Sequence, residues 1–198
     1  MRILSGRYKG RKLLPPVGRD VTRPMTALIK KSLFDSLAAW LPEAVVADLY
    51  CGTGNVGLEA LSRGARRCCF ADRDRLALNR LKRNIETVGA AQAATVWAGV
   101  IETHLPGWLA ELGEELDLAF MDPPFPAVRE WDWPRMERAL FAPLAAATAA
   151  DGLVVLRTPD RAEPPERLAE LAAVRVRRYG GMSVTMYGRP DVVGREGS

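Results

Sequence analysis

Short apolar runs alternate along the chain with longer segments in which apolar residues recur every three or four positions. The apolar runs predict strands over residues 44–49, 67–72, 94–98, 116–121 and 153–157. The helical spacing predicts helices over about 24–41, 56–61, 76–85, 102–112 and 134–148, the first with Thr22 as its cap and Pro24 in its first turn. This alternation predicts an α/β fold with an open, mostly parallel sheet covered by helices on both faces.

The two ends of the chain show a different pattern. Residues 174–179 and 182–187 alternate between apolar and polar positions around two glycines, which predicts an antiparallel hairpin and brings the sheet to seven strands. Near the start, Gly-Arg-Tyr-Lys-Gly at 6–10 predicts a turn between two short strands, with Leu4, Leu13 and Leu14 as apolar anchors. We therefore expect a basic N-terminal hairpin extension over residues 1–22, one domain over 23–190 and a tail over 191–198.

The length and composition are those of a compact globular protein. The chain has 198 residues, of which 48% are hydrophobic and 26% charged, and its net charge is only +4. It contains neither the roughly 20 successive apolar residues that a bilayer requires nor a signal-peptide run at its start, so we expect a soluble cytoplasmic protein. The thiols of Cys51, Cys68 and Cys69 are expected to be reduced, and with His104 as the one histidine no zinc site is expected.

The positive charge is concentrated at the N-terminus. Residues 1–31 contain nine of the 28 lysines and arginines and one of the 24 acidic residues, which gives a local charge of +8 and leaves −4 for the rest. Clustered cations favour binding to a polyanion because they contact phosphates and release counterions. A nucleic-acid partner is therefore expected, although a solvated, disordered basic tail would show the same charge pattern. The candidate contacts are Arg2, Arg7, Lys9, Arg11, Lys12 and Arg23.

A glycine-rich loop, Asp48-Leu-Tyr-Cys-Gly-Thr-Gly-Asn-Val-Gly57, joins the first predicted strand to the next helix. Ligands bind at such strand ends in open α/β sheets, and Gly52, Gly54 and Gly57 fit the spacing of dinucleotide enzymes. Asp48 opposes a pyrophosphate but attracts the amino group of a cationic ligand without phosphates, such as S-adenosylmethionine. Asp72, at the end of the second strand, can accept hydrogen bonds from ribose hydroxyls, although a tight turn with a helix-capping acid would use the same residues.

The segment Met-Asp-Pro-Pro-Phe at 121–125 follows the fourth predicted strand. Its two prolines restrain the backbone and remove two N–H donors, which leaves the Asp122 carboxylate and the carbonyls as acceptors beside an aromatic ring. Asp122 and the Pro123 carbonyl can hold the two hydrogens of an exocyclic amine in line with a sulfonium methyl group, with Phe125 stacked on the base. The alternative is a rigid loop with a surface phenylalanine.

Together these two segments resemble those of a class I, Rossmann-like S-adenosylmethionine methyltransferase that acts on amino groups. The chain is more narrowly similar to the bacterial RsmD family of 16S rRNA (guanine(966)-N2)-methyltransferases. The similarity extends from residue 2 to about residue 189. It is carried by residues 2–13, 23–26, 33–35 and 57–65 and by the closing Tyr179-Gly180 strand pair.

The resemblance implies transfer of a methyl group from S-adenosylmethionine to the exocyclic N2 of a guanine in small-subunit rRNA, with S-adenosylhomocysteine as product and no metal. It implies that the basic hairpin contacts rRNA in the 30S subunit or its assembly intermediate, and we expect a monomer. The implied cofactor-binding residues are Asp48, Cys51, Gly52, Gly54, Asp72, Arg73, Gly99 and Val100. The implied catalytic residues, which hold the base, are Asp122, Pro123, Pro124 and Phe125.

Two positions depart from the family pattern. Lys31 stands where family members usually have glutamate, which puts any role of that acid in doubt. Ala98-Gly99-Val100 stands where related enzymes place Asp or Asn beside the adenine, so only backbone atoms are left for that contact. Trp131 and Trp133 follow the Asp122 segment and are expected on opposite faces of a strand-like stretch, as RNA contacts or as core residues.

Three other functions remain open at this point. An adenine-N6 methyltransferase would use the same Asp-Pro-Pro-Phe segment on RNA or DNA, and a dinucleotide oxidoreductase would use the glycine triplet. A non-catalytic RNA-binding or assembly factor would need only the basic hairpin. Cys51 is expected to be a small buried thiol rather than a nucleophile, and His104 is expected to be incidental to catalysis.

Overall fold

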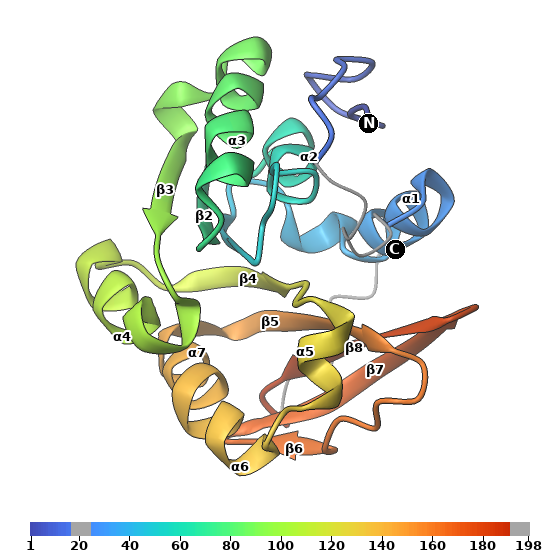
Figure 1. The fold of residues 1–198 in the computed structure, drawn as a ribbon, viewed down its shortest axis with the longest axis vertical. Helices are drawn as coiled ribbons and strands as arrows, with labels where there is room; N and C mark the ends of the chain where they lie inside the picture. Colours follow the sequence, from blue (N-terminus) through green and yellow to red (C-terminus); the bar gives the residue numbers. More distant parts are fainter. Residues whose placement is uncertain (17–24, 191–198) are drawn as a thin grey trace.

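The computed structural model of the protein describes residues 1–16 and 25–190. Their central feature is an eight-stranded sheet with the strand order β3-β2-β1-β4-β5-β8-β7-β6 (Figure 1). β1 to β5 are parallel, and β8, β7 and β6 continue the sheet in antiparallel pairing. The strands are β1 (Val45–Leu49), β2 (Arg67–Asp72), β3 (Ala94–Ala98), β4 (Leu116–Met121), β5 (Thr148–Pro159), β6 (Arg167–Leu168), β7 (Leu171–Tyr179) and β8 (Met182–Gly188).

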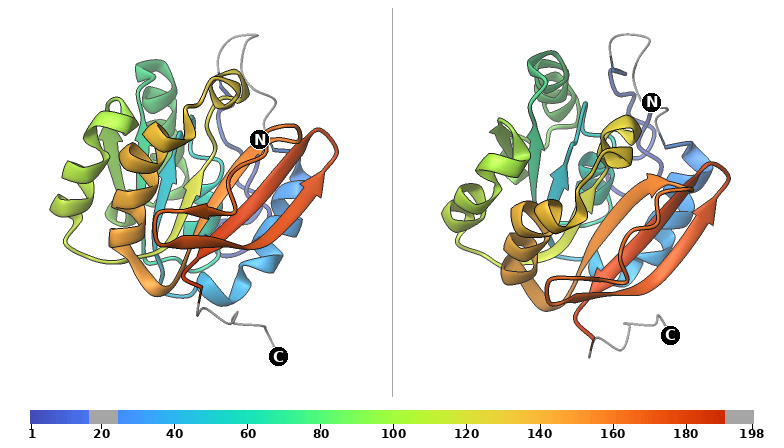
Figure 2. Two further views of the ribbon diagram at one scale, coloured as in Figure 1. Left: turned by 90° about the horizontal axis from the view of Figure 1, so that it is seen from below. Right: turned by 60° about the horizontal axis from the view of Figure 1, so that its bottom comes forward.

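Helices cover both faces of the sheet, which confirms the predicted α/β architecture (Figure 2). One face packs against α1 (Ala27–Ser36), α2 (Gly57–Ser62) and α3 (Arg75–Val88). The other packs against α4 (Ile101–Leu112), α6 (Trp133–Met136), a π-helical turn (Glu137–Phe141) and α7 (Ala142–Ala147). Alternate strand residues supply two separate cores, since Val46 and Leu118 enter the first and Ala47 and Ala119 the second.

The strand order changes direction beside β1, and this places the two loops of interest together. The chain passes from β1 to β2 and β3 on one side and then crosses to β4 on the other side. In open α/β sheets ligands bind at this point, outside the carboxyl ends of the strands. The segments after β1 and β4 lie side by side there, and the Asp122 N–H donates to the Leu49 carbonyl at 3.2 Å.

Several predicted boundaries were wrong. The sheet has eight strands instead of seven because β6, which has only two residues and pairs only with β7, is too short for any periodicity to reveal. The predicted helix over 134–148 is divided into α6, the π-helical turn and α7, and it ends at Ala147. Thr148 already pairs with Leu116 of β4, so sheet pairing overrides the helix propensity of the alanine-rich stretch. A short helix, α5 (Phe125–Arg129), was not predicted.

The first helix is also shorter than the predicted one. It begins after Thr26, whose Oγ1 accepts from the Ile29 N–H, and ends at Ser36 before a 3-10 turn at Ala38–Trp40. The proposed cap Thr22, the first-turn Pro24, Arg23 and the tail over 191–198 lie outside the described residues.

The start of the chain, residues 1–14, is referred to below as the N-terminal arm. It reverses direction as predicted, but with a single antiparallel bridge between Arg2 and Lys12 in place of two strands. Its backbone is bound to α2, because the Arg7 N–H donates to the Ser62 carbonyl at 2.8 Å. A Cβ on Gly6 would lie 1.7 Å from that same carbonyl oxygen, so only glycine fits the contact. The arm is therefore a folded part of the domain and not a disordered tail.

Candidate active site at the ends of β1, β2 and β4

The glycine-rich loop after β1 is fixed to the sheet by two carboxylates. Asp48 is 1% exposed, and its Oδ2 accepts from the Gly57 N–H at 2.8 Å, where α2 begins. Asp72, at the end of β2, accepts from the Gly52 N–H at 2.8 Å through Oδ2 and from the Asp74 N–H at 2.9 Å through Oδ1. Each carboxylate oxygen of Asp72 has a second lone pair, so hydroxyl groups of a ligand can still donate to it.

The three glycines of the loop have different physical roles. A Cβ on Gly57 would lie 2.4 Å from Phe70 Cε1, and a Cβ on Gly54 would lie 2.4 Å from Leu81 Cδ1, so both residues allow the loop to pack on the core. Gly52 has a φ of +54°, and no heavy atom lies within 4 Å of the position its Cβ would take. Gly52 is therefore the glycine at which a ligand can approach the backbone closely.

Burial raises the pKa of Asp48 to about 7. The Gly57 N–H opposes that rise, and the negative charges of Asp122 and Asp72 add to it. A positively charged ligand group near this carboxylate would favour its ionised form. The cluster of three acids at neighbouring strand ends is thus suited to a cation and unsuited to a phosphate.

Substitution of Asp48 by asparagine is expected to change the pH dependence of stability. The pKa of Asp48 is raised from 3.8 to about 7 on folding. The stabilisation that its protonated side chain gives the folded state is therefore complete below about pH 4 and is lost as the pH rises to about 7. Asp48→Asn has no such loss. Its free energy of unfolding, relative to that of the wild type, should therefore rise by about 2–4 kcal/mol between these two pH values. Urea unfolding at pH 4.5 and pH 8 measures the effect.

Asp117→Asn is the matched control for that measurement. Asp117 also accepts a backbone N–H, from Val45 at 2.8 Å, but its side chain is not fully buried. A stability difference between Asp48→Asn and the wild type that stays constant with pH would contradict the prediction.

The segment after β4 places a carboxylate and a ring together. The parallel register pairs Met121 with Leu156, so Asp122, which directly follows β4, is the neighbour of Arg157 on β5. One guanidinium nitrogen of Arg157 lies 2.7 Å from Oδ1 and 2.6 Å from Oδ2 of Asp122. The guanidinium carbon also lies 4.8 Å from the centre of the Phe125 ring. Pro123 is buried and Pro124 is exposed, and α5 begins at Phe125.

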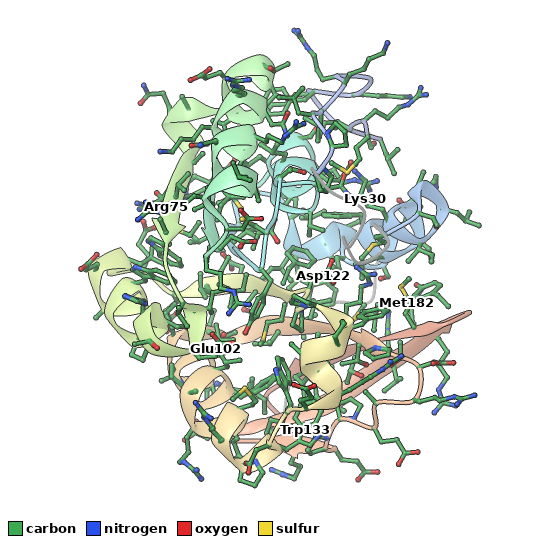
Figure 3. The ribbon with its side chains drawn as sticks, viewed as in Figure 1. Lys30, Arg75, Glu102, Asp122, Trp133 and Met182 are labelled. Carbon is green, nitrogen blue, oxygen red and sulfur yellow. The ribbon has the colours of Figure 1, made fainter. Side chains whose placement is uncertain are left out.

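Asp122 lies in the middle of the molecule, with its side chain 27% exposed (Figure 3). Burial raises the pKa of Asp122, and the Arg157 guanidinium opposes the rise by its charge and its hydrogen bonds. The carboxylate therefore has a solvent-accessible side and a fixed orientation, as an acceptor for an incoming amine requires.

The other predicted cofactor-binding residues are Arg73, Gly99, Val100 and Cys51. Arg73 is exposed beside Asp72, and the Gly99 N–H donates to the Asp72 carbonyl at 3.0 Å. Val100 is 41% exposed, and its carbonyl lies 2.8 Å from His104 Nδ1. The prediction that Cys51 is a buried thiol is confirmed, because it is 8% exposed and burial raises its pKa well above the usual range.

The described residues contain no group of three or more His, Cys, Asp or Glu side chains that could hold a metal ion. None of the helices in the described part of the chain has the length and apolar character needed to cross a bilayer.

Comparison with known proteins places the chain in a family. The sequence profile of the family described as "Conserved hypothetical protein 95" matches residues 1–188. The chain is 32% identical over 192 residues to "Putative rRNA methyltransferase YlbH" of Bacillus subtilis, with 94% of this chain and 98% of that protein covered. The chain belongs to this family.

Other relatives agree with that assignment. Over 125 residues the chain is 34% identical to "Ribosomal RNA small subunit methyltransferase D" of Escherichia coli, which covers 63% of this chain and 60% of that protein. A solved structure of a hypothetical protein from Thermus thermophilus matches with a TM-score of 0.76 and 32% identity, over 94% of this chain and 98% of that chain. The resemblance to the RsmD family and the class I methyltransferase fold are thereby confirmed.

The two departures from the RsmD pattern have simple structural settings. The Lys31 side chain is 65% exposed and pairs with Asp35 one turn further along α1. The cation that reaches the glycine-rich loop is instead its neighbour Lys30, whose Nζ lies 3.0 Å from Asn55 Oδ1. A Cβ on Gly99 would lie 3.1 Å from His104 Nδ1, so any side chain there would crowd that ring.

The prediction that Trp131 and Trp133 lie on opposite faces was wrong. Both are half-buried against the second core, with ring centroids 5.4 Å apart in an edge-to-face contact. With Arg129 and Arg161 they line a 280 Å³ pocket beyond α5, and Figure 3 shows Trp133 well separated from Asp122. The helical turn that begins at Trp133 replaces the strand-like alternation that we expected.

Sequence reasoning missed two residues that shape the site of this RsmD-family protein. Arg157 was missed as the partner of Asp122, although a lone arginine after the apolar run 153–156 is a signal that could have been used. Tyr50 has a φ of +60° and donates through its hydroxyl to Glu102 Oε1 at 2.8 Å. Burial raises the pKa of Tyr50, so the phenol stays a donor that ties the loop to the first turn of α4.

Proposed function

We propose that this chain transfers a methyl group from S-adenosylmethionine to the exocyclic N2 of a guanine in 16S rRNA. The observation that carries the proposal is the contact between the two loops, in which the Asp122 N–H donates to the Leu49 carbonyl beside the glycine-rich loop. A base held at Asp122 would thus lie next to a cofactor held at the ends of β1 and β2. The names of the relatives as rRNA methyltransferases support the same class of substrate.

The residues present fit S-adenosylmethionine. The open side of Gly52 allows close approach, Asp72 has acceptor capacity for ribose hydroxyls, and the buried Asp48 places negative charge near a cationic ligand. Gly99 and Val100 would offer backbone atoms to the adenine. When bound, this cofactor supplies an electrophilic methyl group on a sulfonium.

The residues after β4 would prepare the amine. The lone pair of a guanine amino group is delocalised into the ring, which makes the nitrogen a poor nucleophile. Asp122 and the Pro123 carbonyl would accept its two hydrogens, and Phe125 would stack on the base and fix its plane. As the nitrogen forms its bond to the methyl carbon, the bond from that carbon to the sulfonium sulfur would break, and the sulfur would leave as the neutral thioether of S-adenosylhomocysteine. The nitrogen would then be positive, and Asp122 is placed to accept the proton that must leave.

The proposal is tested by methyl transfer from tritium-labelled S-adenosylmethionine to small ribosomal subunits that lack the modification. Label is expected in 16S rRNA, and mass mapping is expected to locate it on N2 of one guanine. Label on N6 of an adenine, or transfer to DNA alone, would contradict the assignment. Naked 16S rRNA and an assembly intermediate, offered in parallel, decide between the forms of the substrate.

We also propose that the protein works in the cytoplasm as a monomer and that the N-terminal arm contacts the rRNA. Every cationic side chain of the arm is exposed, and the Arg7 guanidinium lies 4.8 Å from the centre of the Tyr8 ring. Lys30 links the arm to the cofactor loop, since its Nζ lies 3.2 Å from the Arg2 carbonyl and 3.4 Å from the Asn55 carbonyl.

The proposed monomeric state is tested by sedimentation equilibrium, which measures the oligomeric state.

The combined substitution Arg7→Gln, Lys9→Gln and Arg11→Gln is expected to weaken RNA binding and its dependence on salt. Each lost phosphate contact should reduce the slope of log K against log salt concentration by about 1. These side chains are exposed, so the arm should remain folded and cofactor affinity should not change. Filter binding at several salt concentrations measures the slope.

The control is Arg135→Gln combined with Arg138→Gln, which removes two exposed positive charges from α6 and the π-helical turn after it. Figure 1 shows α6 on the opposite side of the molecule from the N-terminus. If the arm variant kept the wild-type slope, the arm would have no phosphate contacts. Deletion of the arm is a poorer test, because its backbone is bound to α2.

A further inference from the structure

Arg157 connects three groups around the proposed base site. It is 3% exposed on β5, where it follows the apolar residues 153–156. A single nitrogen of its guanidinium is shared by both oxygens of Asp122, and its Nε lies 3.2 Å from Met182 Sδ at the start of β8. The same guanidinium covers the ring of Phe125. The side chain thus joins the segment after β4 to the start of the C-terminal hairpin.

The position of that nitrogen decides which acceptors of Asp122 remain. It lies between the two carboxylate oxygens, at 2.7 and 2.6 Å, so it uses the inner lone pair of each. Each oxygen keeps an outer lone pair, and the plane of the carboxylate is fixed.

The charges around Asp122 explain why it needs such a partner. The negative charges of Asp122 and Asp72 both act on Asp48 of β1, and the Arg157 guanidinium from β5 contacts Asp122 with positive charge. Burial favours protonated Asp122, which would donate rather than accept. Among the described residues, Arg157 is the cation whose charge and hydrogen bonds favour the ionised form of Asp122.

We propose that Arg157 is a positioning residue for methyl transfer, which holds both the Asp122 carboxylate and the Phe125 ring in the orientation that receives the base. The proposal rests on the proposed function. It assigns Arg157 no contact with the substrate or cofactor. Its effect is to present Asp122 as an oriented anion and Phe125 as an immobile stacking surface.

Arg157→Met and Arg157→Lys test this role. Arg157→Met removes the charge and fills the volume. It is expected to reduce kcat by about 10–100-fold at pH 7. The acidic limb of its profile of kcat against pH is expected to move up by about 1–3 pH units. Arg157→Lys keeps the charge, so its acidic limb should stay near that of the wild type while kcat recovers only in part. Arg167→Met, an exposed position on β6, is the control and should retain wild-type kcat.

Two further readouts separate positioning from a structural role. In the cofactor-free protein, the carboxyl carbon of Asp122 can be titrated by NMR, and its pKa is expected to be higher in Arg157→Met than in the wild type. When Arg157→Met is added to Asp122→Asn, kcat should fall by less than a further threefold. The reason is that the effects of substitutions at residues that act through one another are not additive. Thermal unfolding of each variant reports whether the fold is retained.

The outcomes are distinct from those that test the proposed function. If the wild type methylates rRNA but Arg157→Met and Arg157→Lys keep its pH profile and kcat, the role of Arg157 is wrong and the function stands. If Arg157→Met is unfolded, Arg157→Lys decides the question: a reduced kcat with an unchanged acidic limb supports the positioning role, and a wild-type kcat contradicts it. If the wild type transfers no methyl group to any nucleic acid, the function itself is wrong.

Discussion

Substitution of Asp122 by asparagine is expected to lower kcat for methyl transfer by about 10²–10⁴-fold, the range that a positioned proton acceptor contributes. Asparagine has the same shape, and its backbone can keep the hydrogen bond to the Leu49 carbonyl. Its amide, however, carries no charge and presents an NH₂ group where the carboxylate presents an acceptor. Arg157 on one side and the amine on the other would then compete for a single oxygen.

Single-turnover kinetics with saturating RNA measures this effect without interference from product release. Affinities for S-adenosylmethionine and for RNA should stay within about threefold of the wild type, because neither the glycine-rich loop nor the arm is changed. Asp160→Asn, at an exposed position after β5, removes the same charge and serves as the control. A kcat within threefold of the wild type in Asp122→Asn would remove Asp122 from the mechanism.

Substitution of Glu59 by alanine is expected to lower the free energy of unfolding by about 3–5 kcal/mol, the cost of leaving a buried charge without its partner. Glu59 is fully buried on α2, and its Oε2 lies 2.9 Å from Lys30 Nζ, which is itself buried. Its two oxygens also accept from the Leu4 N–H at 2.8 Å and the Ser5 N–H at 3.1 Å, and from Arg63 Nε at 3.0 Å. Loss of this carboxylate would therefore leave two backbone donors of the arm unsatisfied.

The pH dependence of that loss has a definite sign. Burial lowers the pKa of Lys30, and the hydrogen bond and charge of Glu59 partly restore it. Without Glu59 the pKa of Lys30 falls further, so the lysine loses its proton more easily in the folded protein than in the unfolded chain. The destabilisation of Glu59→Ala should accordingly be smaller at pH 9.5 than at pH 7.

Glu114→Ala is the matched control for Glu59→Ala. Glu114 also pairs with two cations, Arg66 and Arg67, but its side chain is 32% exposed. Exposed ion pairs contribute about 0–1 kcal/mol, so this variant should differ little from the wild type in urea unfolding. An equal effect of the two substitutions would show that burial does not decide the contribution of Glu59.

These interactions show how far the sequence predicts the site. The glycine-rich loop and the Asp-Pro-Pro-Phe segment were identified because glycine and proline end regular structure locally, wherever they occur. Their proximity followed from the parallel sheet, whose strand ends meet at one edge. The positions of Asp48, Asp72 and Asp122 at those ends were therefore expected, and the structure brings all three together.

The partners of these acids could not be predicted in the same way. Arg157 meets Asp122 because the register of β4 and β5 pairs Met121 with Leu156, and a shift of one residue would turn the two side chains to opposite faces. Glu59 meets Lys30 and the arm across separations of 29 and 55 residues. No local spacing encodes such contacts, since they depend on how complete elements pack.

The sequence alone determined the alternation of strand and helix, the two site loops and the basic character of the first residues. These features rest on local periodicity, on the conformations of glycine and proline and on charge, all of which act over a few neighbouring residues. The tertiary structure decided that the arm is bound to α2, that Asp122 has an arginine beside it and that β6 completes the sheet. Those outcomes require distant segments to meet, and burial then fixes which charges must pair.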